Sequence, residues 1–283
     1  MQDDNWTEII TKESSKGNVL KDLLRKRDLI LLFVKRDFAK EFKQTILGPI
    51  WFVIQPLFQT VVLLFVFGKI GKMGPAGIPM VSFYLAGAMM WGVFSENVLK
   101  TSETFRTNAG IFGKVYFPRL VMPVSMLLTN YLKLGVQFVI FLIIYFIELS
   151  MSDLIQPNFT ILLVPVYFFL CSIAGMGIGL VLCSLTTKYW DLRFMVQFAM
   201  QLLMFLSAVI TPLSMLEPGW MKTIIQLNPA SPYIESFRYA FLGNAAGSFD
   251  QAWLIYAVAF SFTVLLLGIY AFRRVERTFI DSI

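Results

Sequence analysis

The stretch FTILLVPVYFFLCSIAGMGIGLVLCSL, residues 159–185, has no charged side chain in 27 consecutive positions. A helix needs about 20 apolar residues to cross a bilayer, whereas a barrel strand needs only about 9–11. Because unpaired backbone groups are too costly in lipid, only helices and closed barrels span membranes. The stretch therefore predicts a transmembrane helix. Gly175 and Gly179 within it form a GxxxG pattern, which indicates close helix packing.

The rest of the chain repeats this apolar character. Hydrophobic residues make up 57% of the chain and charged residues 15%, with a mean hydropathy of +0.68. In soluble proteins roughly 45–50% of the residues are apolar and about 25% are charged. Six runs are long enough to span a membrane, at residues 47–67, 78–98, 120–147, 159–185, 194–216 and 252–272. We therefore predict an all-α integral membrane protein with six transmembrane helices.

Lysine and arginine residues fix the predicted orientation. They gather before the first run, in the loops after the second and fourth runs, and in the tail. The positive-inside rule then places both termini in the cytoplasm. The predicted parts are a cytoplasmic segment 1–46, a six-span domain 47–273 and a tail 274–283. Anionic headgroups account for the net charge of +6, so membrane lipids are expected as partners and nucleic acid is not.

Residues 19–43 have the pattern of a helix that lies in the membrane interface, with lysines and arginines between regularly spaced apolar residues. The apolar set is Leu20, Leu23, Leu24, Leu31, Val34, Phe38 and Phe42. Such a helix either only anchors the chain to lipid or also contacts a partner.

The loop at 217–250 keeps many apolar residues although it is predicted to lie outside. Ser231 can cap a helix, Pro232 suits its first turn and Gly243 can end it. We predict two short re-entrant helices here, with a packed connector as the alternative.

The sequence contains no motif for nucleotide or metal chemistry. Gly110 and Gly113 precede Lys114, but the spacing and the Ser/Thr of a phosphate-binding loop are missing. There is no histidine, and Cys171 and Cys183 both lie on the fourth predicted span. We therefore expect no metal site, no bound cofactor and no ATP hydrolysis on this chain.

Ionisable residues interrupt the second and third runs. Glu96, Lys100 and Glu103 share one face of the second helix, and Lys133 lies about halfway along the third at a depth similar to Glu96. An ionisable residue inside a membrane is a candidate functional residue. The structural alternative is that Glu96 pairs with Lys100 and Lys133 to hold the helices together.

Two stripes of amides and aromatics lie on the first and fifth predicted spans. They consist of Trp51, Gln55, Phe58 and Gln59, and of Gln197, Phe198, Gln201, Phe205 and Thr211. Amides bond hydroxyl groups and aromatic faces stack on sugar rings, so these stripes can line a translocation path. Helix packing through polar groups is the alternative.

Four stretches together resemble the membrane subunit of type-2 ABC exporters that move lipid-linked polysaccharides such as O-antigen or teichoic acid. They are FKQTILGPIWFVIQPLF (42–58), KVYFPRLVMPVS (114–125), KYWDLRFMVQFAMQLLMFLSAVITP (188–212) and LNPASPYIESFRYAFLG (227–243). The resemblance implies six spans, a homodimer, and two copies of a soluble ATPase subunit that binds ATP and magnesium. The membrane subunit itself is then a transport subunit and not an enzyme.

By the same resemblance, residues 108–118 correspond to a coupling helix that docks on the ATPase. Lys114 and Arg119 would meet acidic or backbone groups, and Tyr116 and Phe117 would fill a pocket. The implied contact set is Ile111, Phe112, Lys114, Val115, Tyr116, Phe117, Pro118 and Arg119. A loop held only by lipid headgroups is the alternative.

The resemblance also implies an undecaprenyl-diphosphate-linked glycan as substrate, moved across a bacterial inner (plasma) membrane. Lys40 and Lys43 are candidates to hold the diphosphate as point charges on the cytoplasmic side. No residue identifies the sugar. The alternatives are a type-2 exporter of drugs or other lipids, and a polytopic glycosyl or acyl transferase. The few intramembrane charges count against a proton-coupled transporter.

Overall fold

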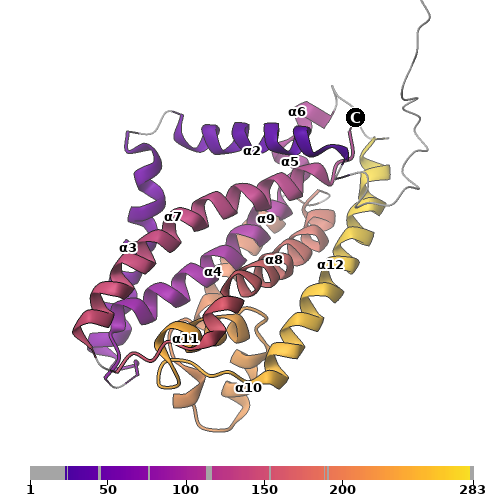
Figure 1. Ribbon diagram of the computed structural model, residues 1–283. Helices are drawn as coiled ribbons and strands as arrows, with labels where there is room; N and C mark the ends of the chain where they lie inside the picture. Colours follow the sequence, from indigo (N-terminus) through magenta and orange to yellow (C-terminus); the bar gives the residue numbers. More distant parts are fainter. Residues whose placement is uncertain are drawn as a thin grey trace, which may run out of the picture.

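The computed structural model describes residues 23, 25–43, 46–75, 77–112, 117–152, 154–187, 189 and 191–280. Every regular element in this part of the chain is a helix, so the all-α class is confirmed (Figure 1). The helices are α2 (Arg27–Phe42), η2 (Gly48–Ile50), α3 (Trp51–Leu63), η3 (Leu64–Ile70), α4 (Met80–Ser102), α5 (Thr104–Thr107), α6 (Ala109–Phe112), α7 (Val121–Met151), η4 (Phe159–Leu163), α8 (Val164–Thr186), α9 (Leu192–Phe205), η5 (Leu213–Met215), α10 (Trp220–Leu227), α11 (Ser231–Leu242) and α12 (Gln251–Ile280).

Four helices are long and apolar enough to cross a membrane. They are Trp51–Ile70, Val121–Met151, Phe159–Thr186 and Gln251–Glu276. These correspond to the first, third, fourth and sixth predicted runs. α4 corresponds to the second run and has 23 residues, most of them buried among the other helices.

The fifth predicted run, 194–216, does not form one helix. α9 ends at Phe205 after 14 residues, and the chain then turns until η5 begins at Leu213. The side chain of Asn228, just before α11, donates hydrogen bonds to the carbonyls of Leu203 (3.2 Å) and Leu206 (3.0 Å). Irregular backbone at membrane depth is tolerated where protein groups satisfy it. The residues in this break are mostly apolar, so hydropathy alone does not reveal it. The prediction of one continuous helix over 194–216 was wrong.

α8 lies at the centre of the bundle, between α4 and α12 (Figure 1). A Cβ atom on Gly175 would lie 2.6 Å from the carbonyl oxygen of Phe94 in α4, and Gly179 is equally tight against α4. On the opposite side, a Cβ on Gly177 would lie 2.7 Å from the backbone nitrogen of Leu265 in α12. The close packing predicted from the GxxxG pattern is therefore confirmed, and it occurs on two faces of α8.

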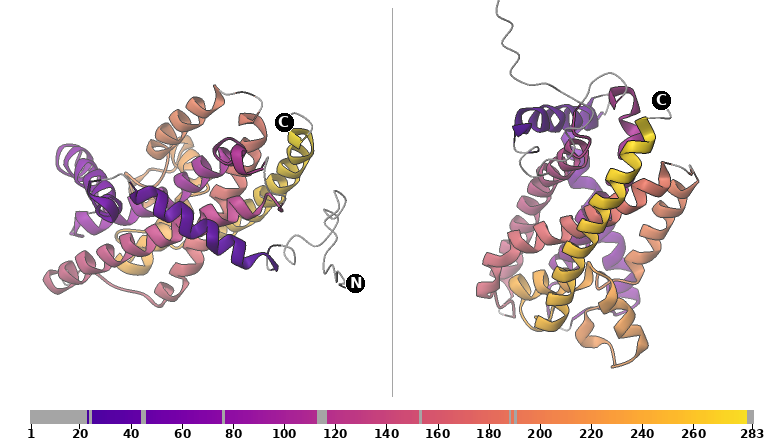
Figure 2. Two further views of the ribbon diagram at one scale, coloured as in Figure 1. Left: turned by 90° about the horizontal axis from the view of Figure 1, so that it is seen from above. Right: turned by 90° about the vertical axis from the view of Figure 1, so that its right-hand side faces the viewer.

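α2 lies crosswise over one end of the bundle, which we call the α2 end (Figures 1 and 2). α5, α6 and the last turns of α12 lie at the same end, whereas α10 and α11 lie at the opposite, α11 end. Ile30, Phe33 and Val34 of α2 are buried against Phe117 and its neighbours.

The apolar face predicted for α2 differs from the packed face. Leu31 is 53% exposed, although its spacing placed it with Val34, because Ile30 and Phe33 turn toward the bundle instead. Of the predicted set, Leu20, Leu24 and the side chain of Phe42 lie outside the described residues.

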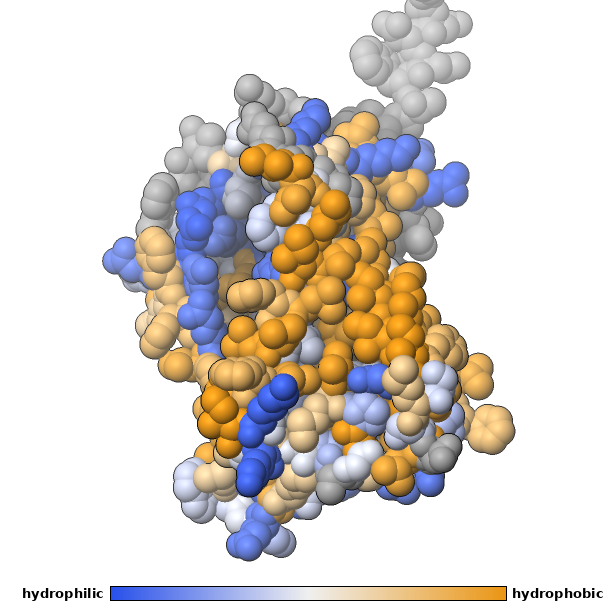
Figure 3. All heavy atoms as spheres, turned by 90° about the vertical axis from the view of Figure 1, so that its left-hand side faces the viewer, coloured by the Kyte–Doolittle hydropathy of each residue, from blue (hydrophilic) through white to orange (hydrophobic). Residues whose placement is uncertain are grey.

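The outside of the bundle is strongly hydrophobic. Hydrophobic side chains cover much of the face in Figure 3, and polar ones gather mainly toward its two ends. Phe58 on α3, Phe198 on α9 and Leu266 on α12 are each at least 60% exposed. Apolar side chains exposed at this density fit a surface in contact with lipid.

Candidate functional site

Four charged side chains from three helices meet near the α2 end, and we call them the charge cluster. They are Glu41 of α2, Glu96 and Lys100 of α4, and Lys133 of α7. Glu41 lies 2.8 Å from Lys100 and 2.7 Å from Lys133, measured between carboxylate oxygen and Nζ. Glu96 lies 3.6 Å from Lys100 and 3.5 Å from Lys133. The structure thus brings together three of the four ionisable residues singled out in the second and third runs, and adds Glu41.

The charge cluster carries no net charge, because it holds two carboxylates and two ammonium groups. Its side chains are only partly shielded from solvent, from 11% exposed for Lys133 to 36% for Glu96. Removing charges from water is costly unless pairing offsets the loss. Burial raises the pKa of the Glu41 carboxyl, but the nearby Lys100 and Lys133 outweigh burial and hold this pKa below its ordinary value of 4.5. Glu41 therefore stays ionised and ties α2 to α4 and α7.

The sequence pattern did not single out Glu41, because residues 19–43 indicate a helix with a basic polar face. Counting the intramembrane charges would have indicated a second acid, since Glu96 can balance only one of Lys100 and Lys133. Glu103, which shares a helix face with Glu96 in the sequence, is not part of the cluster. It pairs with Arg106 at 3.2 Å and with Arg193, in the first turn of α9, at 2.8 Å.

The connector between α4 and α7 is attached to α2 by side chains. Asn108, 4% exposed, accepts a hydrogen bond from Arg36 of α2 at 3.2 Å and donates one to the carbonyl of Thr104 at 3.1 Å. The ring of Phe117 packs 5.4 Å from that of Phe33 in α2. The connector and α2 are therefore joined by a hydrogen bond and by ring packing.

The residues expected to contact an ATPase are placed unevenly. Phe117 and Arg119 are 7% and 8% exposed, so both side chains pack inside this chain, contrary to the expectation that they face a partner. The Arg119 guanidinium lies over the rings of Phe105 and Phe112 at 5.7 and 5.3 Å and donates to the carbonyl of Glu276 at 3.2 Å. Two aromatic rings and one carbonyl near the end of α12 therefore stabilise the Arg119 cation within this chain. Ile111, Phe112 and Pro118 are half-buried, and Lys114, Val115 and Tyr116 lie outside the described residues.

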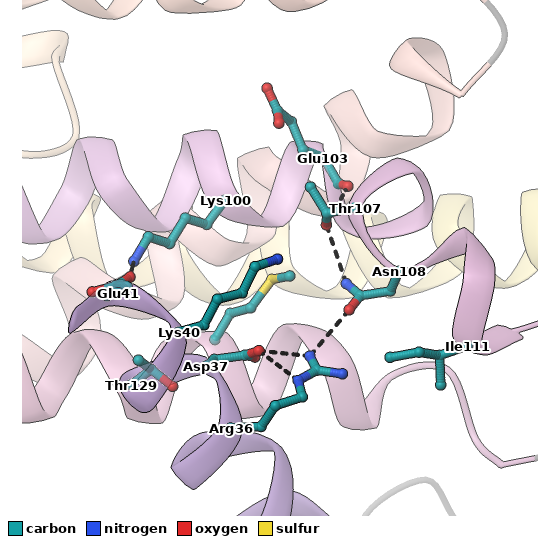
Figure 4. A pocket seen from close by; sticks show the side chains of 11 residues that line it. Arg36, Asp37, Lys40, Glu41, Lys100, Glu103, Thr107, Asn108, Ile111 and Thr129 are labelled. Atoms are coloured by element: carbon teal, nitrogen blue, oxygen red, sulfur yellow. Dashed lines mark hydrogen bonds and ion pairs between the residues drawn. The ribbon is translucent and has the colours of Figure 1, made fainter. Parts of the chain in front are cut away.

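A pocket of about 550 Å³ lies between α2, the ends of α4 and α7, and the connector (Figure 4). Its charged lining is Arg36, Asp37, Lys40, Glu41, Lys100 and Glu103. Arg36 pairs with Asp37 at 2.6 Å, and Lys100 and Glu103 have the partners given above. Lys40 points into the pocket and makes no ion pair among the described residues. Lys43, the other predicted diphosphate ligand, is exposed at the end of α2 and does not line the pocket.

The two predicted path stripes lie on neighbouring helices. The Gln59 amide of α3 lies 3.2 Å from the Met204 sulfur of α9, and the rings of Phe67 and Phe205 are 6.3 Å apart. Thr211 lies in the break after α9 and is half-buried. The remaining stripe residues are exposed in this chain, namely Trp51, Gln55, Phe58, Gln197, Phe198 and Gln201.

The α11 end holds a second charged group, Glu235 and Arg238, which the sequence analysis did not find. Arg238 is fully buried, although it lies in the loop at 217–250 that is predicted to be outside. Its guanidinium donates to the carbonyls of Ala208 and of Val209 (2.7 Å), within the break after α9, and lies 3.6 Å from the ring of Phe83 in α4. A signal was available in the i, i+3 spacing of opposite charges in an otherwise apolar helix.

Glu235 fixes the chain on the far side of the same break. It is 2% exposed and lies 3.9 Å from Arg238. Its carboxylate accepts hydrogen bonds from the backbone of Leu213 (3.3 Å) and of Ser248 (3.0 Å). The pair therefore satisfies main-chain groups at both ends of the segment that replaces a continuous helix.

Comparisons with known proteins agree with this arrangement. The chain is 24% identical over 251 residues to the O-antigen export system permease protein RfbA of Klebsiella pneumoniae, covering 86% of this chain and 91% of the relative. It is 22% identical to RfbA of Myxococcus xanthus, covering 94% and 99%. It is 21% identical to the capsule polysaccharide export inner-membrane protein CtrC of Neisseria meningitidis, covering 94% and 98%. The ABC-2 type transporter family model matches residues 28–242. The chain is a multi-pass membrane protein that belongs to the ABC-2 type transporter membrane family.

Proposed function

We propose that this chain is the transmembrane subunit of an exporter that moves a polysaccharide out of the bacterial cytoplasm, powered by ATP hydrolysis on a separate subunit. The observation that carries the proposal is the match, over nearly the whole chain, to relatives named as O-antigen and capsule export permeases. The substrate class follows from those names. Undecaprenyl diphosphate as the lipid carrier is part of the proposal.

In this proposal the chain crosses the inner membrane six times, with the α2 end in the cytoplasm. α4 joins the four long apolar helices as a fifth crossing, and α9 with the segment 206–212 makes the sixth. Cations on α2, on the connector and at the end of α12 agree with this orientation by the positive-inside rule. α10 and α11 are then short helices at the outer surface.

The translocation path is proposed to lie between two copies of the chain. Gln55, Gln197 and Gln201 are exposed on α3 and α9, and an amide left facing lipid costs free energy. Two copies that meet through α3 and α9 would enclose these amides with the neighbouring aromatics. Such a lining provides hydrogen bonds and stacking surfaces for sugar rings.

Coupling to the ATPase is proposed to run through the connector and α2. Closure of two ATPase subunits would displace α5 and α6. Because Asn108 bonds Arg36, α2 would move with them, and Glu41 would transmit the movement to Lys100 and Lys133. The pocket beneath α2 would change shape in the same step. Lys40 within it is proposed to hold the substrate diphosphate as a point charge.

A cross-linking experiment tests the proposed function. Ala109 is exposed on α6, and Cys171 and Cys183 are buried, so Ala109→Cys supplies an accessible thiol for a short photo-cross-linker. In whole membranes we expect it to capture a soluble chain with a phosphate-binding loop. Met151→Cys, 82% exposed at the far end of α7, is the control and should not capture that chain. Capture of lipid alone at both positions would overturn the coupling assignment.

A further inference from the structure

A polar pocket of about 510 Å³ lies at the α11 end, between η5, α10 and the start of α12. It is separate from the pocket beneath α2 and from both path stripes. Its lining includes Ser214, Lys222, Gln226, Asp250 and Gln251. Its volume falls within the range of about 300–1,000 Å³ that is usual for small-molecule sites.

The lining offers many hydrogen bonds and little net charge. Lys222 and Asp250 carry opposite charges, and each glutamine amide presents one acceptor and two donors. Within the part of the chain that the structure describes, the side chains of Ser214, Gln226 and Gln251 make no hydrogen bond with other protein groups. These groups suit a ligand rich in hydroxyls, whereas an anion would call for more cations and a lipid tail for an apolar lining.

The walls of the pocket are held in place by α11. Each oxygen of the buried Glu235 carboxylate fixes one wall, through the N–H of Leu213 (3.3 Å) and through the N–H and Oγ of Ser248 (3.0 and 3.1 Å). The ring of Phe249, which also lines the pocket, stacks on Tyr239 of α11 with centroids 5.7 Å apart. A site with fixed walls loses little conformational freedom when a ligand binds.

The pocket adjoins the end of the proposed path. Leu213 follows the path residue Thr211 by two positions, on the segment that Arg238 and Glu235 hold. Figure 1 places α10 and α11 at the end of the molecule away from α2. A glycan that left the proposed path at this end would pass the pocket.

We propose that this pocket is an outer saccharide subsite, which binds a short stretch of the emerging glycan through Lys222, Gln226 and Gln251. The inference rests on the proposed export function and adds a site for the sugar outside the path. Binding here would favour outward movement, because sugar that is held at the mouth is less free to return.

The test places a photo-cross-linking residue, p-benzoylphenylalanine, at Gln226 in cells that make the polysaccharide. The matched control is the same residue at Ile224, which is 41% exposed on α10 and does not line the pocket. After irradiation the chain is purified and stained for sugar by periodate oxidation and a hydrazide dye. We expect a sugar-stained, slowly migrating chain for position 226 only, and none when polymer synthesis is blocked.

A second measurement uses Gln226→Ala combined with Gln251→Ala. We expect about fivefold slower arrival of polymer at the surface at unchanged chain abundance, since two hydrogen-bonding groups are lost. A lipid adduct alone at position 226, or no sugar adduct while polymer still reaches the surface, would overturn the subsite and leave the export function standing. If polymer arrival does not depend on the chain at all, the proposed function itself fails.

Discussion

The charge cluster at the α2 end and the Glu235–Arg238 pair at the α11 end both place acids and cations inside a bundle of helices, but their partners differ. In the charge cluster, side chains of three helices bond one another and remain between 11% and 36% exposed. In the pair, both side chains are at most 2% exposed and bond mainly to backbone groups. Partly hydrated side-chain pairs can exchange partners when helices move. A dry pair that bonds the main chain instead fixes one conformation.

The largest expected effect comes from breaking the pair at the α11 end. Arg238→Met should lower the free energy of unfolding by about 3–5 kcal/mol, because Glu235 keeps a buried charge and several carbonyls lose their donor. Denaturation of the purified chain in detergent measures the loss. Arg27→Met is the control, since Arg27 is 81% exposed, and it should change stability by less than about 0.5 kcal/mol. Equal losses for the two variants would contradict the comparison.

A smaller effect is expected in the charge cluster. Glu41→Gln and Lys133→Gln should each cost about 1–2 kcal/mol, because the groups are partly hydrated and each variant leaves one charge unbalanced. The double variant keeps Glu96 with Lys100 and is again neutral. It should therefore cost less than the sum of the single variants by about 1 kcal/mol. Strict additivity in this double-mutant cycle would show that the two residues act independently.

The charge cluster should also respond to acid. The pKa of Glu41 in the folded chain lies below its ordinary value of 4.5, so the stability that ionised Glu41 contributes is present above pH 4.5 and is lost as the pH falls through the folded-state pKa. Spin labels on Leu31 of α2 and Ile143 of α7, both exposed, report the position of α2. We expect a narrow distance distribution at neutral pH that broadens on acidification.

The control for acidification is Glu41→Gln carrying the same two labels. It should give the broad distribution already at neutral pH and show no further change in acid. If Glu41→Gln gives the same narrow distribution as the unsubstituted chain at neutral pH, Glu41 is not what holds α2 in place.

The smallest effect on stability, with a clear effect on transport, is expected at Lys40. Lys40→Gln should change the free energy of unfolding by less than about 0.5 kcal/mol, yet slow polymer export, because Lys40 lines the pocket beneath α2. Lys43→Gln, three residues away and outside the pocket, is the matched control. Equal export rates in the two variants would remove Lys40 from the diphosphate assignment.

The comparison also shows which features the sequence can predict. Long apolar runs gave four of the predicted spans directly, because a run such as 159–185 has few other stable structures. Glycines at 175 and 179 predicted close packing because only a missing side chain permits it. These are local properties that each segment carries by itself.

Features that depend on contacts between distant segments were missed. Glu41 looked like a member of a basic helix until Lys100 and Lys133 were seen beside it. The run 194–216 looked like a helix because the groups that satisfy its break, on Asn228 and Arg238, come from another segment. Phe117 and Arg119 fitted an exposed docking loop by composition, but α2 and the end of α12 cover them.

The neutrality of the charge cluster has an electrical consequence. The potential across a bacterial membrane does about 2.3 kcal/mol of work per elementary charge per 100 mV. When Glu41, Glu96, Lys100 and Lys133 shift together, no net charge moves and voltage does no work on them. If α2 departs with Glu41, α4 and α7 keep Glu96 against two lysines and carry one net positive charge. The paired arrangement therefore offers the membrane potential no net charge to act on, whereas a separated arrangement would offer one.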